Sequence, residues 1–367
     1  MAEPGRAQCF PAKSPPFQAA YIGRASMVSA EHLTLESSRI GKLYQAVTDE
    51  ARPTSQFGGI LVRCKEVLRP TQAGTASTPR WIDVDGPSYM MKIACKSLVL
   101  ARAAIQGREP GNMWGEDPYK EIAVLQLLNE GGGHPHIEKI VDAFEDDKFL
   151  YKISLFCDGG DVLAAIPLAE TEMQRIAHEL LAAVAFCHAC GVMHRDISPE
   201  NILLETRADG VRSVCLIDFG MAVSIPRDET GWPLLLESQH YCGKPSYMAP
   251  EVFFEASVDA KAADLFSCGT TLYACLVGVP PWKSVSDRLF CLIAVEGHLA
   301  SLLRHWNIDH VSPAAADLLQ GMLWANPRRR LASYDGIHSH PWFSLTTRCT
   351  GEGGTGDDAA LAVPQAV

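Results

Sequence analysis

The sequence has no long uninterrupted hydrophobic run and no charged N-terminal region followed by an apolar stretch. Its most apolar segment, residues 265–279, is broken by glycine and threonine and is shorter than the roughly 20 residues that a helix needs to cross a bilayer. These absences argue against a transmembrane helix and a secretory signal peptide, so we expect no membrane partner. The 12 cysteines then fit reduced thiols in a cytoplasmic or nuclear protein.

Positive charge is also scarce. The chain has 32 Lys and Arg residues against 43 Asp and Glu residues, which gives a net charge of −11. Such a chain repels a phosphate backbone, so we expect no nucleic-acid partner. The 47% hydrophobic and 20% charged residues are typical of a globular protein, so most of the 367 residues should fold.

The hydrophobic pattern changes along the chain. Between residues 40 and 94, aliphatic runs alternate with Pro, Gly and Ser, which favours antiparallel strands. Asp117 and Pro118 then predict the start of a helix, and four longer segments of helical spacing follow residue 170. The sequence therefore predicts an α+β fold, with a small antiparallel β lobe carrying one main helix and a larger, mainly α-helical lobe.

Three short motifs follow one another in the second half of the chain. They are His194-Arg195-Asp196 with Asn201 five residues after the aspartate, Asp218-Phe219-Gly220, and Ala249-Pro250-Glu251. In this order they resemble the eukaryotic protein kinase family, in its serine/threonine type, over about residues 40 to 344. The resemblance implies ATP and Mg²⁺ as cofactors and transfer of the γ-phosphoryl group to a protein Ser or Thr hydroxyl.

The resemblance also implies a bilobal protein kinase fold. Its boundaries would be a flexible leader at 1–38, an N-lobe at 39–154, a hinge at 155–158, a C-lobe at 159–344 and a flexible tail at 345–367. The sequence of residues 276–282 resembles that of the calmodulin-dependent kinases. The tail, however, lacks a basic amphipathic helix. Regulation by calmodulin is therefore not expected.

The motifs imply roles for polar residues. Asp196 would accept a hydrogen bond from the substrate hydroxyl, and Asn201 and Asp218 would hold Mg²⁺. The run Ile93-Ala94-Cys95-Lys96 resembles the family's strand lysine motif. We therefore expect Lys96 to contact the phosphates and to pair with Glu121 of the predicted helix.

Lys92 is a rival for the role of the phosphate-contacting lysine. It lies four residues before Lys96, so strand alternation would put both on one face. The alanine two residues before Lys96 favours Lys96.

The loop that covers the phosphates departs from the family pattern. Of three expected glycines only Gly58 remains, and Pro53 and Ser55 replace the other two. Backbone amides near Phe57 and Gly58 should still reach phosphate, with weaker nucleotide binding. The remaining expected nucleotide contacts are Ile60, Ala94 and Leu203 around the ring, Ser154 at the back, Leu155, Phe156 and Cys157 in the hinge, and Asp161 after it.

A second departure involves two positions together. The family's serine/threonine kinases carry Lys two residues after the catalytic Asp, where this chain has Ser198. They carry Thr where this chain has Lys244. We hypothesise that the two positions have exchanged their roles. Lys244 would then supply the positive charge at the γ-phosphate, and Ser198 would supply the hydroxyl. Independent drift, with Lys244 facing solvent, is the alternative.

Arg195 implies an activation segment ordered by a phosphate, added by an upstream kinase or by autophosphorylation. The sequence offers Thr230, Ser238 and Tyr241 and does not choose among them.

The remaining matches are architectural. Asp264 would brace the catalytic loop, and Glu251 would pair with Arg330. The run Cys187-His188-Ala189-Cys190 could supply half a zinc site, but core packing is favoured because a second pair of ligands is lacking.

The acids Asp161 and Glu200, together with the net charge of −11, favour a basic peptide substrate. A pseudokinase that acts as a nucleotide-binding or scaffolding protein is the rival function, because the glycine loop and Ser198 are altered. A third hypothesis is a small-molecule kinase of related fold. The segment Ala249-Pro250-Glu251 argues against it.

Overall fold

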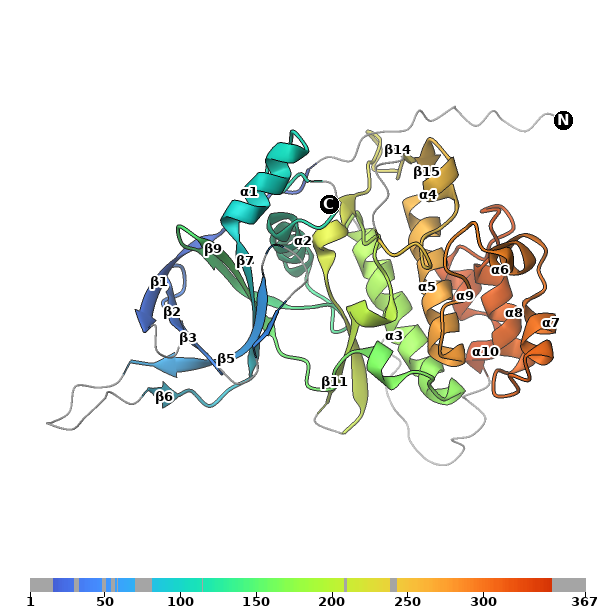
Figure 1. Cartoon of the computed structure of the whole chain (residues 1–367), viewed down its shortest axis with the longest axis horizontal. Coiled ribbons are helices and arrows are strands. Elements are labelled where there is room, and N and C mark those ends of the chain that lie inside the picture. The colour runs from blue at the N-terminus through green and yellow to red at the C-terminus, as the bar shows by residue number, and fades with distance from the viewer. Residues whose placement is uncertain are drawn as a thin grey trace, which may run out of the picture.

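The computed structural model describes residues 16–29, 33–47, 51–53, 57, 59–69, 81–113, 115–207, 210–237 and 243–344. Figure 1 shows a strand-rich lobe beside a helix-rich lobe, as the sequence predicts. Within the described ranges, no helix is long and apolar enough to cross a membrane. The predicted Gly58, Ser238 and Tyr241 and the tail at 345–367 lie outside the described residues.

The first lobe is one nine-stranded sheet in the order β3-β2-β1-β8-β9-β7-β5-β4, with β6 paired to β5. Because β3 also pairs with β5, the path closes on itself like a barrel. Aromatic side chains fill its interior, among them Tyr44, Phe144 and Tyr151. The strands are β1 (Gly23–Ser29), β2 (Thr34–Ser37), β3 (Leu43–Ala46), β4 (Arg52–Pro53), β5 (Ile60–Leu68), β6 (Ile82–Asp83), β7 (Tyr89–Cys95), β8 (Ile140–Glu145) and β9 (Phe149–Leu155).

Strands β1 and β2 correct the prediction of a flexible leader over residues 1–38. Leu35 of β2 is fully buried. The Gln126 side chain accepts a hydrogen bond from the Ala20 amide at 2.7 Å and donates one to the Tyr21 carbonyl at 2.7 Å. This segment is ordered because β1 pairs with β8, more than 100 residues later in the chain. A local sequence pattern cannot reveal such a pairing.

Two helices pack beside this sheet. Helix α1 (Lys96–Ile105) follows β7 without a loop. Helix α2 (Pro118–Glu130) begins as predicted, because the Asp117 carboxylate accepts the amides of Tyr119 and Lys120 at 3.0 and 3.3 Å. The Asp117 amide donates to the Gly220 carbonyl at 3.0 Å, which joins the start of α2 to the Asp218 motif.

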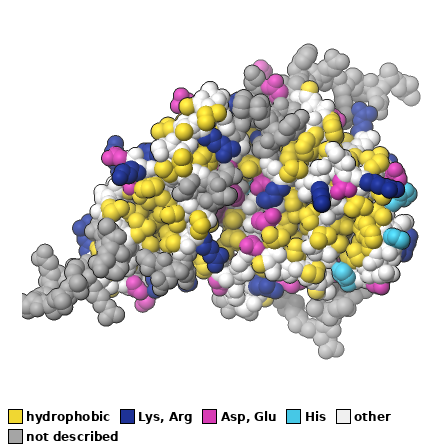
Figure 2. Space-filling view, viewed as in Figure 1, with side chains coloured by type: hydrophobic (Ala, Val, Ile, Leu, Met, Phe, Trp, Pro, Cys, Tyr) yellow, Lys and Arg dark blue, Asp and Glu magenta, His cyan; other side chains and the backbone are white. Residues whose placement is uncertain are grey.

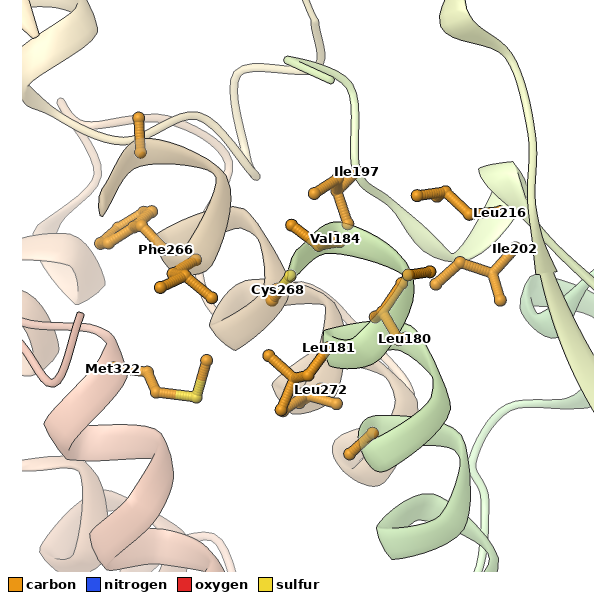
Figure 3. Packing of buried hydrophobic residues seen from close by; sticks show 14 of the residues in the cluster. Leu180, Leu181, Val184, Ile197, Ile202, Leu216, Phe266, Cys268, Leu272 and Met322 are labelled. Atoms are coloured by element: carbon orange, nitrogen blue, oxygen red, sulfur yellow. The ribbon is translucent and has the colours of Figure 1, made fainter. Parts of the chain in front are cut away.

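The second lobe forms around helices α3 and α5. Figure 3 shows Leu181 and Val184 of α3 beside Cys268 and Leu272 of α5, with Met322 of α8 on the other side of α5. The helices are α3 (Glu170–Ala189), α4 (Glu251–Phe254), α5 (Ala260–Val277), α6 (Arg288–Phe290), α7 (Leu299–His305), α8 (Pro313–Met322), α9 (Tyr334–His338) and α10 (Pro341–Ser344), with a π-helical turn η5 (Cys291–Val295).

Short strands and 3₁₀ turns hold the loops of the second lobe. The strand pairs are β10 (Val192–Met193) with β13 (Val223–Ser224), β11 (Ile202–Thr206) with β12 (Arg212–Leu216), and β14 (Leu236–Glu237) with β15 (Ser257–Val258). The 3₁₀ turns are η2 (Val162–Ala165), η3 (Pro199–Asn201) and η4 (Phe219–Met221).

The predicted architectural contacts are confirmed. The buried Asp264 of α5 accepts the amides of His194 and Arg195 at 2.8 and 3.0 Å, so it fixes the loop that carries Asp196. His188 lies in the core, where its ring nitrogens contact Asp264 at 2.9 Å and the Tyr334 hydroxyl at 2.6 Å. His188 therefore packs in the core, as the sequence analysis favoured for the run 187–190.

Candidate active site

A cavity of about 470 Å³ lies where the two lobes meet. Leu155, Phe156 and Cys157, at and just after the end of β9, line the cavity; their role as a hinge stays a prediction. Ser154, Asp161 and Leu203 also line the cavity, in agreement with the sequence-based expectation. Figure 2 shows Lys, Arg, Asp and Glu side chains near the middle of the molecule, between the lobes.

Two expected wall residues are replaced by others. Leu61 and Met90 line the cavity, whereas Ile60 and Ala94 are not among the described residues that do so. Alternation along β5 explains the first correction: Val62 and Cys64 point into the barrel core, so Leu61 points to the cavity. On β7, the cavity is lined by Met90 and Lys92, each four residues, or two strand alternations, before the expected Ala94 and Lys96.

Lys92 lies at the centre of a buried ionic cluster. Its Nζ is 2.9 Å from Glu121 Oε2 on α2, 3.5 Å from Glu116 Oε1 and 3.9 Å from Asp218 Oδ1. Burial disfavours the ammonium, but the charges of Asp218, Glu121 and Glu116 outweigh it and hold the pKa of Lys92 well above its ordinary value. Lys92 is thus a fixed cation joined to both α2 and the Asp218 motif.

The predicted pairing of Lys96 with Glu121 is wrong. Lys96 Nζ donates to the Asp146 carbonyl at 2.9 Å and lies 3.1 Å from Glu145 Oε2, at the turn between β8 and β9. The alternation argument assumed that the strand continues to residue 96. Because β7 ends at Cys95 and α1 begins at Lys96, the side chain leaves the face that Lys92 occupies.

Phe57 also lies away from the cavity wall. Its carbonyl accepts the Cys95 amide at 3.1 Å, and its ring packs with the cluster of Val99, Ala103 and Met113. Its φ of 52° is left-handed, as a tight turn requires. Phe57 is therefore not among the described residues that line the cavity, although the sequence analysis expected it to contact the nucleotide.

The loop after β10 fixes the carboxylate of Asp196. Asn201 Nδ2 donates to Asp196 Oδ2 at 2.8 Å and to the Asp196 carbonyl at 2.7 Å. Lys244 Nζ approaches the same Oδ2 at 3.3 Å. Within the described residues, the buried Asp196 Oδ1 has no hydrogen-bond partner, so one oxygen of the carboxylate is held and the other is unpaired.

Asp218 lies next to this loop. The Ile217 amide donates to the Asn201 carbonyl at 3.0 Å, which places the two motifs side by side. Asp218 has a left-handed φ of 64°, and its Oδ1 accepts the Gly220 amide at 3.4 Å. Asn201 directs its amide nitrogen to Asp196. The side-chain oxygens of Asn201 and Asp218 are hard donors of the kind that suit Mg²⁺.

The sequence argument missed three charged residues of this site. Lys152 of β9 is buried and lies 2.7 Å from Glu121 Oε1 and 2.6 Å from Glu138 Oε1. Lys152 and Lys92 together lower the pKa of Glu121 to about 2 against the effect of burial. The signal for Lys152 was its position two residues before Ser154, on the same strand face; Glu116 and Glu138 belong to no motif.

Glu116 provides a pH-dependent prediction. Burial raises its pKa to about 7, opposed by Lys92 and assisted by Asp218 and Glu121. The folded protein therefore keeps this proton from about pH 4.5 to pH 7, where the unfolded chain loses it, so the stability it contributes falls as the pH rises through that window. Glu116→Gln should stabilise the protein more at pH 8 than at pH 5, by on the order of 2 kcal/mol.

Urea unfolding at the two pH values measures this difference. The variant Glu255→Gln, at an exposed position, serves as the control for any general effect of removing a carboxylate. An equal effect of Glu116→Gln at both pH values would show that Glu116 titrates like an exposed glutamate.

The predicted phosphorylation and charge-exchange residues are placed as follows. Thr230 is exposed, and its Oγ1 donates to Asp228 Oδ1 at 2.6 Å. Lys244 Nζ donates to Ser198 Oγ at 2.7 Å. The structure thus brings Ser198 and Lys244 together at Asp196.

Comparisons with known proteins agree with this geometry. A family model described as "Protein kinase domain" matches residues 89–343, which is more than half of the chain. The calcium/calmodulin-dependent protein kinase type II subunit delta of Oryctolagus cuniculus is 32% identical over 230 residues, covering 61% of this chain and 40% of that relative. The chain therefore spans about two fifths of the length of this curated relative.

Proposed function

Because the chain belongs to the protein kinase family, with a serine/threonine kinase of the calmodulin-dependent group among its relatives, we propose that it transfers the γ-phosphoryl group of ATP to Ser or Thr residues of proteins. The free Asp196 Oδ1 carries this proposal. A buried carboxylate oxygen without a partner costs free energy, and a substrate hydroxyl would satisfy it.

Each step of the transfer has a residue. Asp196 Oδ1 accepts the hydrogen bond and then the proton of the acceptor hydroxyl, while Oδ2 stays held by Asn201. Lys92, fixed by Glu121, would contact the phosphates of the nucleotide and orient them. Asp218 and the Asn201 oxygen would hold Mg²⁺, which neutralises the charge on the phosphates of the bound nucleotide.

Two acids near the cavity support a basic peptide substrate. Asp161 and Glu200 both line it, and Glu200 Oε2 lies 3.8 Å from the Lys244 ammonium without a hydrogen bond to it. An arginine of the substrate could bind the carboxylates of Asp161 and Glu200 at the cavity. We place the reaction in the cytoplasm or nucleus, because the described cysteines are all free thiols.

A pseudokinase is the second candidate. The observation that favours it is Pro53, which forms β4 with Arg52 where the family has the start of a glycine-rich loop and which has no amide to offer a phosphate. The proposal of an active enzyme is preferred because the residues of both the proton-accepting and the metal-binding groups are present and adjacent.

A peptide array with Mg²⁺ and labelled ATP tests the substrate class. We expect label on Ser and Thr peptides with an upstream Arg, little label on the matched Tyr peptides, and none on metabolite acceptors such as sugars. Asp196→Asn gives the background. Label on Tyr peptides alone, or on metabolites alone, would contradict the assignment.

A further inference from the structure

Lys244 forms a short contact with the loop that carries Asp196. Its Nζ lies 2.7 Å from Ser198 Oγ, 3.3 Å from Asp196 Oδ2 and 3.8 Å from Glu200 Oε2. Ser198 is fully buried, whereas the Lys244 side chain keeps 36% of its surface exposed. The ammonium is therefore partly exposed and has one hydroxyl and two carboxylates around it.

The backbone before Lys244 explains how the lysine reaches this position. Gly243 has a φ of 100°, and a Cβ added there would lie 2.7 Å from the Arg195 carbonyl oxygen. Only glycine allows so close an approach with that φ. The backbone at Gly243 thus lies directly against the catalytic loop, one residue before Lys244.

The charge of Lys244 and the small size of Ser198 explain the contact between the two side chains. Ser198 occupies a buried position two residues after Asp196, and its hydroxyl is too short to bring a donor to a phosphate. Lys244, which lies outside the catalytic loop, brings its ammonium to the Asp196 carboxylate. The Ser198 oxygen accepts one ammonium proton and leaves the others for the carboxylates and for a ligand.

We propose that Lys244 is the catalytic cation at the transferred phosphoryl group and that Ser198 is its positioning residue. This inference rests on the proposed kinase function. The acceptor oxygen attacks the γ-phosphorus, its proton passes to Asp196 Oδ1, and the bond to the β–γ bridging oxygen breaks to release ADP. Lys244 stabilises the negative charge on the transferred group during this step.

One regulatory consequence follows. The charge comes from the segment that runs from Gly220 to Ala249, and not from the catalytic loop itself. Any change that moves this segment away from Arg195 therefore removes the cation along with it. Activity and the position of this segment are coupled through a single side chain.

Four proteins test the exchange: the wild type, Lys244→Thr, Ser198→Lys and the double variant. We expect Lys244→Thr to lower kcat about 10²-fold with the KM for MgATP changed only a few-fold. The double variant, which returns the cation to position 198, should recover at least ten-fold over Lys244→Thr. Lys148→Thr, at the exposed turn between β8 and β9, is the matched control.

A second measurement is independent of turnover. Unfolding of Lys244→Met, Ser198→Ala and their combination should be non-additive, with a coupling of about five-fold in the unfolding equilibrium constant. Should the double exchange variant fail to fold, Lys244→Arg against Lys244→Gln replaces it, and only the arginine variant should stay within ten-fold of wild-type kcat.

The outcomes separate this inference from the proposed function. An active wild type with an unimpaired Lys244→Thr, a double variant as slow as Lys244→Thr, or additive unfolding energies would overturn the exchange alone. A wild type that turns over no faster than Asp196→Asn would overturn both. Loss in Lys244→Thr with recovery in the double variant supports both.

Discussion

Lys92→Met should lower kcat/KM for phosphotransfer by about 10³-fold, whereas Lys96→Met should leave it within about three-fold of the wild type. Lys92 is the cation that contacts Glu121, Glu116 and Asp218 at the cavity wall. Lys96 lies instead at the β8–β9 turn, bonded to the Asp146 carbonyl. Steady-state kinetics with MgATP and a Ser peptide measure both variants.

The pair of lysine variants is its own control, since both remove one ammonium from the same sequence run. Circular dichroism and thermal unfolding establish that each variant is folded. If Lys96→Met were the inactive variant and Lys92→Met the active one, the assignment of the phosphate-contacting lysine would have to be reversed.

Arg330→Met should destabilise the protein by about 3 to 5 kcal/mol. The guanidinium forms two bonds to Glu251, at 2.6 and 2.8 Å, and also donates to the carbonyls of Trp324, Ala262 and Ala325. The two charged side chains have exposed fractions of only 0% and 4%. Removing the arginine leaves the Glu251 carboxylate buried and unpaired, and denaturant unfolding measures the cost.

A surface pair provides the comparison. Lys65 and Asp83 form an ion pair at 3.1 Å with both side chains about half exposed, so Lys65→Met should cost no more than about 0.5 kcal/mol. Equal losses for Arg330→Met and Lys65→Met would mean that the Glu251–Arg330 pair does not hold the helical lobe together.

The chemistry-bearing motifs could be predicted from the sequence because they are short and local. Asp196, Asn201 and Asp218 lie within 23 residues of one another, and the β11–β12 hairpin between them closes the distance. The start of α2 was equally predictable, since Asp117 and Pro118 fix it locally. These parts required no knowledge of distant contacts.

The parts that failed depend on where a strand ends and on pairing across the chain. Lys92 and Lys96 share a face only while β7 continues, and the chain turns into α1 at residue 96. Strand β1 has few apolar residues and is ordered by β2 and β8. The cluster around Lys152 of β9 joins Glu121 of α2 and Glu138, which lies just before β8, and no local window contains all three residues.

Single-turnover transfer tests the central claim most directly. The protein, in excess over γ-labelled MgATP, is mixed with a Ser peptide, and labelled peptide is followed over time for the wild type and Asp196→Asn. We predict transfer by the wild type at least 10³-fold faster than by Asp196→Asn, with equal nucleotide binding by both. Equal binding with equally slow transfer would contradict the account, because the free oxygen of Asp196 would then have no part in the chemistry.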